Sequence, residues 1–182
     1  TKGLNASPGG ACGQIYFNAK DAEAAAAEGK DVLLVRVETS PEDIGGMAVS
    51  RGIVTCRGGM TSHAAVVARG MGCPCVSGCG EITINEPKKT LVVNGKELHE
   101  GDYMAIDGFT GNVYAQKIAV KPSEIMQVLE GTMRESESML YQDYKKFMDY
   151  VNEIKTMSVR TNADTPKDAR YAIMLGAEGI GL

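Results

Sequence analysis

Short apolar runs alternate with small amphipathic segments through the first part of the chain. The runs at 14–17, 32–35 and 53–55 have the length and side chains typical of buried strands. Between them, 21–29 is rich in alanine, begins with an acidic residue and ends in glycine, which predicts a helix. A proline at the start of 41–47 predicts a second short helix. This alternation indicates a mixed α/β domain.

Two hairpins are predicted after these elements. In the first, over residues 90–98, Asn94-Gly95 separates two strand-like runs, which is a strong signal for a type I′ turn. In the second, 103–107 and 112–114 flank a turn with glycine at both ends. After these hairpins the strand pattern stops, so we expect the α/β domain to end near Val120.

A different pattern begins at Lys121-Pro122-Ser123. Apolar residues then recur three or four positions apart up to Met157, which predicts amphipathic helix, broken near Gly131 or Ser136. This stripe fits either a linker that lets the first domain travel or a helix packed against the part of the chain after it. Its members are Ile125, Leu129, Met133, Leu140, Tyr144, Phe147, Val151 and Ile154.

The last part of the chain has a β-α-β pattern. Residues 158–162 suggest a strand, a helix begins with Pro166 near its first position and ends near Gly176, and 179–182 begins a further strand. The chain also has no initiator methionine and stops without a closing element, so we expect it to be a piece of a longer polypeptide.

Composition narrows the function classes. The net charge is −4 and no basic run is present, which argues against nucleic acid as a partner. No apolar run is long enough to cross a bilayer and no signal-peptide pattern appears, so we expect no membrane association. The five cysteines lack zinc-site spacing, which predicts no metal site. Their odd number and the absent export signal predict reduced thiols in an intracellular compartment.

The candidate chemistry lies in the segment GGMTSHAAVVARGMG, residues 58–72. Two glycines give the loop conformational freedom, and Thr61 or Ser62 can cap the helix that we expect from Ala64 to Arg69, with Gly70 ending it. His63 therefore lies at a helix start, where free N–H groups and the helix dipole favour an anion. A neutral imidazole at this place suits attack on a phosphoryl group, followed by retention of that group.

This segment, followed by CPCVSGC, resembles the phosphohistidine segment of the pyruvate, phosphate dikinase family. Phosphoenolpyruvate synthase and enzyme I of the sugar phosphotransferase system share its Gly-Gly-x-Thr-x-His frame but usually carry Arg where this chain has Met60. The resemblance implies a β/β/α swivelling phosphohistidine domain over 1–120 and a helical linker over 121–157. Residues 158–182 would begin the (β/α)8 barrel that binds phosphoenolpyruvate and pyruvate.

The resemblance also implies roles for individual residues. His63 would be the phosphorylated residue of an enzyme that interconverts ATP, phosphate and pyruvate with AMP, diphosphate and phosphoenolpyruvate. Arg160 matches the family's Val-Arg-x-Asn-Ala-Asp pattern and would bind substrate phosphate. Thr61 matches a threonine that a regulatory kinase phosphorylates in some relatives. ATP, Mg²⁺ and substrates would bind mainly to neighbouring domains, in a homodimeric protein.

Two alternatives stay open at this point. Phosphoenolpyruvate synthase, or another phosphoenolpyruvate-utilising enzyme, would have the same carrier but a different partial reaction. A non-catalytic swivelling module would use the domain for interaction, with a merely structural His63. We expect a cytoplasmic protein, with an organelle such as a plastid or glycosome as the other possibility.

Overall fold

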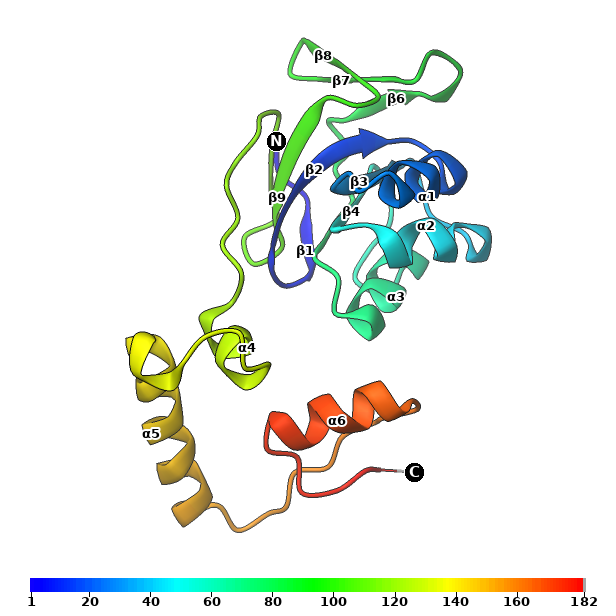
Figure 1. The fold of residues 1–182 in the computed structure, drawn as a ribbon. Helices are drawn as coiled ribbons and strands as arrows, with labels where there is room; N and C mark the ends of the chain where they lie inside the picture. The colour runs from blue at the N-terminus through cyan, green and yellow to red at the C-terminus, as the bar shows by residue number, and fades with distance from the viewer. Residues whose placement is uncertain (182) are drawn as a thin grey trace. The chain divides into compact units, whose positions relative to one another are not determined.

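The computed structural model describes residues 1–181 (Figure 1). For Lys167 it describes the backbone alone. Contacts between Cα atoms divide the chain into two compact units, Thr1–Val120 and Lys121–Leu182. In the part that the model describes, no helix is long and apolar enough to cross a membrane.

A seven-stranded mixed sheet forms the first unit. Its four central neighbours, from β5 to β2, run parallel, whereas β1, β9 and β10 pair antiparallel. An antiparallel bridge between Lys2 and Asn112 links the two edges, so the sheet is nearly closed. In spatial order the strands are β1 (Leu4–Ser7), β5 (Cys75–Ser77), β4 (Gly52–Thr55), β3 (Val32–Arg36), β2 (Gly10–Tyr16), β9 (Tyr103–Asp107) and β10 (Asn112–Tyr114).

Both faces of this sheet are covered, which explains the unbroken apolar run in β3. Val32 and Leu34 face one core and Leu33 and Val35 face another, because successive side chains of a strand point to opposite faces. The first core includes alanines of two helices and Met47 of a third, all seen beside the sheet in Figure 1. These helices are α1 (Ala19–Ala27), α2 (Ile44–Val49) and α3 (His63–Met71).

The second core is covered by a three-stranded antiparallel sheet of β6 (Thr83–Asn85), β7 (Thr90–Val93) and β8 (Lys96–His99). Ile82, Leu91 and Leu98 are buried there against the large sheet. The unit therefore has the β/β/α layers that were expected, and the fold class is confirmed.

The local elements follow the predicted turns closely. Asn94 and Gly95 have φ of 49° and 74°, which is the pair of positive angles that a type I′ turn requires. The second predicted hairpin pairs β9 with β10. The segment predicted as one helix over 41–47 is a 3₁₀ turn, Pro41–Asp43, that continues into α2.

The second unit begins with two helices, α4 (Glu124–Leu129) and α5 (Met139–Ile154). They are separated by Gly131, whose φ is 79°, and by the 3₁₀ turn Glu135–Glu137, so the predicted break in the helical stripe is confirmed. Ser138 caps α5 and accepts a hydrogen bond from the Tyr141 N–H at 3.0 Å.

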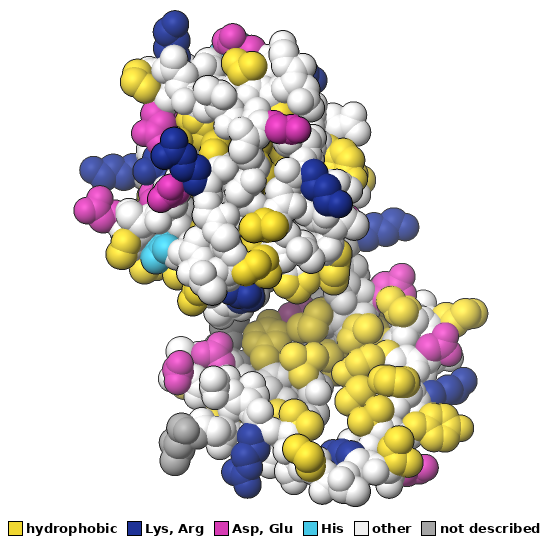
Figure 2. Space-filling view, turned by 180° about the vertical axis from the view of Figure 1, so that it is seen from behind, with side chains coloured by type: hydrophobic (Ala, Val, Ile, Leu, Met, Phe, Trp, Pro, Cys, Tyr) yellow, Lys and Arg dark blue, Asp and Glu magenta, His cyan; other side chains and the backbone are white. Residues whose placement is uncertain are grey.

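The apolar stripe of α5 is exposed or half-buried in this chain. Phe147 and Ile154 are 64% and 77% exposed, and Figure 2 shows hydrophobic side chains gathered on this unit. Tertiary burial therefore does not hold α5 in place as it holds the helices of the first unit. Locally, Ser138 caps the helix, and Lys145 forms an exposed ion pair with Glu135 at 2.8 Å.

The strands expected at 158–162 and from 179 are not formed as strands. One parallel bridge joins Thr161 to Ile180, and the last residue of the second expected strand, Leu182, lies outside the described residues. Between them α6 (Pro166–Met174) forms as predicted, with Thr165 in a capping box. A strand needs a ladder of partners, and the two short segments supply only one bridge.

Candidate active site

The candidate histidine lies where three loops meet at the carboxyl ends of parallel strands. β3 and β4 are neighbours, with Arg36 opposite Thr55 at their ends. Thr39 follows β3 and His63 follows β4, so the two loops converge. The loop after β5 reaches the same place, because a Cβ on Gly78 would lie 2.8 Å from the Gly58 carbonyl oxygen. This crevice is a common location for ligands in α/β proteins.

Helix α3 begins at His63 itself, one residue earlier than predicted. Ser62 is the N-cap, and its hydroxyl accepts a hydrogen bond from the Ala65 N–H at 3.4 Å. The predicted end at Gly70 is wrong by two residues: Gly70 is helical, and Gly72 ends the helix with φ of 66°. The longer helix still places His63 in its first turn, beside N–H groups without an intrahelical acceptor.

The His63 ring is half-buried and has one hydrogen-bond partner, which sequence reasoning missed. Its Nδ1 lies 3.0 Å from the Thr39 hydroxyl oxygen. With the proton on Nδ1, the ring donates to that hydroxyl and keeps the lone pair of Nε2 free. The bond orients the ring, and in this tautomer Nε2 is the atom available for nucleophilic attack.

Arg69 holds the histidine loop against its own helix. Its guanidinium donates to the Met60 carbonyl oxygen through Nη2, and to the Ala65 carbonyl oxygen through Nε at 3.1 Å. Gly58, with φ of 110°, lets the loop turn beside Ser62. The loop is therefore pre-organised around His63 by bonds within a single segment.

The cysteines near this site are neutral structural residues. Burial raises the pKa of Cys56 and Cys75 to about 11, and that of Cys73 and Cys79 to about 12. Thiols in this state are poor metal ligands and poor nucleophiles. No group of three or more His, Cys, Asp or Glu side chains that could hold a metal ion occurs among residues the model describes.

Thr61 and His63 are brought together on one loop. The Thr61 side chain is exposed, and within residues 1–181 its hydroxyl has no hydrogen-bond partner, so it is accessible to a modifying enzyme. Arg160 lies in the second unit, next to the bridge residue Thr161, and is also exposed. A Cβ on Gly179 would lie 3.3 Å from Arg160 Nη1, so glycine leaves room for this guanidinium.

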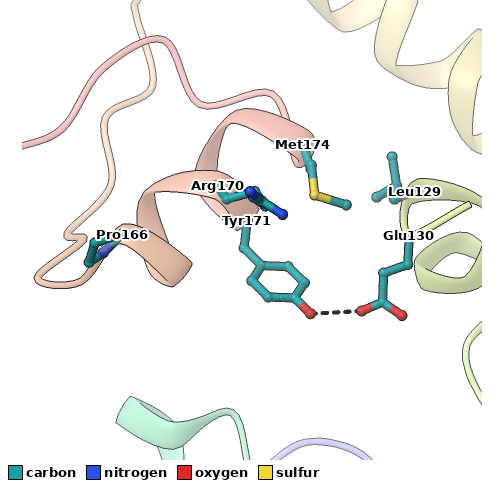
Figure 3. Close-up of a pocket in the computed structure, with 6 residues that line it drawn as sticks. All are labelled: Leu129, Glu130, Pro166, Arg170, Tyr171 and Met174. Carbon is teal, nitrogen blue, oxygen red and sulfur yellow. Dashed lines mark hydrogen bonds between the residues drawn. The ribbon is translucent and has the colours of Figure 1, made fainter.

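The second unit also contains a cavity of about 600 Å³ that does not include Arg160 (Figure 3). The Tyr171 hydroxyl donates to Glu130 Oε1 at 2.8 Å across it, and this bond raises the pKa of Tyr171. The cavity is lined by Leu129, Glu130, Pro166, Arg170, Tyr171 and Met174.

Comparison with known proteins shows which class of domain the first unit contains. Residues 28–111, which include His63, match the family model described as PEP-utilising enzyme, mobile domain. This segment is homologous to that mobile domain, in agreement with the β/β/α layers and the histidine at a helix start.

The particular relatives are pyruvate, phosphate dikinases, to which the chain is homologous over nearly its whole length. It is 51% identical over 179 residues to pyruvate, phosphate dikinase of Clostridium symbiosum, covering 98% of this chain and 19% of that protein. Its identity to pyruvate, phosphate dikinase 1, chloroplastic, of Oryza sativa subsp. japonica is 52% over 180 residues, covering 99% of this chain and 17% of that protein. The chain thus spans less than a fifth of the length of these enzymes.

A solved structure of Enzyme I, determined by NMR in solution, is also similar to the chain. The identity is 26%, the TM-score is 0.33, and the match covers 63% of this chain and 38% of that one. Because this TM-score is low, the assignment of the chain rests on the relatives that are similar in sequence.

Proposed function

We propose that this chain is the phosphoryl-carrying part of a pyruvate, phosphate dikinase, with His63 as the carrier. The observation that carries the proposal is the hydrogen bond between Thr39 and His63 Nδ1 at the start of α3. It leaves Nε2 as the nucleophile, beside backbone N–H groups that favour a bound phosphoryl group.

The proposed chemistry has three steps. First, Nε2 of His63 bonds to the β-phosphorus of ATP, and AMP leaves with the oxygen that bridged the α- and β-phosphorus. Second, an oxygen of inorganic phosphate attacks the terminal phosphorus, and diphosphate leaves while one phosphoryl group stays on His63. Third, pyruvate as its enolate takes that group to give phosphoenolpyruvate. The reverse sequence follows the same path.

The parts of the chain would divide this work. Residues 1–120 carry the group, 121–157 link the carrier to the barrel, and 158–182 begin the barrel, where Arg160 binds substrate phosphate through its planar guanidinium. The donors around His63 are hydroxyl and backbone groups without paired carboxylates, which does not fit a Mg²⁺ site. We therefore place Mg²⁺, ATP and most substrate contacts on other parts of a longer, homodimeric protein.

Regulation and compartment complete the proposal. A phosphate on Thr61 would add roughly −1.5 to −2 charges two residues from His63 and repel the incoming group. Relatives are named from bacteria and, as chloroplastic proteins, from plants, which supports a cytoplasmic or plastid location. Neither membrane nor nucleic acid has a part in the proposed reaction.

The test uses the full-length protein and ATP labelled at its β-phosphate. We expect acid-labile, base-stable label on the protein, and its complete loss in His63→Asn with the fold retained by circular dichroism. Label that persists in His63→Asn would place the nucleophile elsewhere, and no label on the unmodified protein would favour the non-catalytic module. Release of phosphate instead of diphosphate would identify a phosphoenolpyruvate synthase.

A further inference from the structure

We propose that Arg57 binds the group carried on His63, and that it does so chiefly while that group is a diphosphoryl. This inference rests on the proposed function, because it concerns the intermediate formed from ATP. It assigns a role to a side chain that the histidine motif itself does not contain.

The backbone of Arg57 is fixed between the two elements that hold His63. Its N–H donates to the Val37 carbonyl oxygen at 2.9 Å, in the loop that carries Thr39. The next residue, Gly58, packs against the N-cap of α3, since a Cβ there would lie 3.0 Å from Ser62 Oγ. The backbone of Arg57 therefore lies between the Thr39 loop and the start of α3, and we infer that its long side chain extends toward a group bound to Nε2.

The Arg57 guanidinium is free to take an anion, unlike the other cations of this region. Residues 37–85 contain three arginines and no lysine. Arg51 donates to Asp31 at 2.7 Å, and Arg69 donates to two carbonyl oxygens within its own segment. Arg57 is exposed and, within the described residues, its side chain forms no hydrogen bond or ion pair.

The charge of the intermediate explains why a cation is needed there. The start of α3 offers about half a positive charge and a few N–H donors, which suits a single phosphoryl group. A diphosphoryl group carries a further phosphate that extends beyond the first turn of the helix. A guanidinium binds two phosphate oxygens at once and keeps its charge at every physiological pH.

The experiment compares two routes of loading in the full-length enzyme. Rapid-quench measurements would follow label on His63 from β-labelled ATP without phosphate, which gives the diphosphoryl form, and from labelled phosphoenolpyruvate, which gives the phosphoryl form. In Arg57→Gln we expect loading from ATP to slow roughly tenfold, because one charge-assisted hydrogen bond is lost. Loading from phosphoenolpyruvate should change much less. Arg57→Lys should recover part of the rate, and Arg51→Gln serves as the matched control.

A second readout separates phosphate binding from docking of the domain. After prolonged loading from ATP, the ³¹P resonance of the terminal phosphorus should differ between Arg57→Gln and the unmodified enzyme. An unchanged resonance, or equal slowing by both routes, would overturn the proposal for Arg57. Absence of label in the unmodified enzyme would instead refute the proposed function.

Discussion

Replacing Thr39 by Val tests the proposal that its hydrogen bond to His63 Nδ1 selects the nucleophilic nitrogen. Valine keeps the shape of threonine but removes the hydroxyl oxygen that lies 3.0 Å from His63 Nδ1. A half-buried hydrogen bond between neutral groups contributes about 1 kcal/mol, which corresponds to about a fivefold effect on a population or a rate. We therefore expect Thr39→Val to lower the rate of His63 phosphorylation about fivefold, and Thr39→Ser to preserve it.

Two assays separate orientation of the ring from general damage. Rapid-quench labelling in the full-length enzyme gives the rate, and ¹⁵N NMR of the His63 ring gives the tautomer. In the unmodified chain we expect Nδ1 to carry the proton, and in Thr39→Val a shift of protons toward Nε2. A Thr39→Val enzyme with the same rate and the same tautomer as the unmodified one would refute the reasoning. A lower rate with an unchanged tautomer would assign the loss to packing.

Three further predictions concern the same region. Thr61→Glu should lower labelling of His63 by charge repulsion while Thr61→Val preserves it, and equal labelling of both would count against a phosphate switch. Gly70→Ala should raise the free energy of unfolding in urea by up to about 1 kcal/mol, whereas Gly72→Ala, at φ of 66°, should lower it by about as much. Burial raises the pKa of Cys73 from 9.0 to about 12 and that of Cys75 to about 11, so the unfolded thiols lose protons first. Stability should therefore fall as pH rises above 9, and the fall in urea midpoint should be smaller in Cys73→Ala.

Sequence reasoning predicted the elements whose signals are local. The hairpin at Asn94-Gly95 and the break at Gly131 follow from backbone angles that few residues adopt, so a single residue type carries the information. The run in β3 is apolar on both faces because both faces are covered. Such a strand can be predicted from its own residues, without knowing which strands pair with it.

Features that depend on pairing could not be predicted in the same way. Thr39 meets His63 only because β3 and β4 are neighbours, and strand order is not contained in the periodicity of either segment. A polar Thr-Ser-Pro shortly after a buried strand was the available signal. The end of α3 was misplaced because Gly70 and Gly72 have the same local propensity, and only the backbone path separates them.

The pairing of β2 with β9 has a consequence for how the protein is made. Gly10 lies opposite Asp107, and Lys2 bridges to Asn112. The first strands of the unit therefore cannot complete their pairing until nearly its last strands have been synthesised. While a ribosome extends the chain, β3, β4 and β5 can associate early, but one edge of β2 stays unpaired until β9 emerges. Contacts this distant in sequence slow folding. The histidine loop is therefore synthesised well before the sheet beneath it can close.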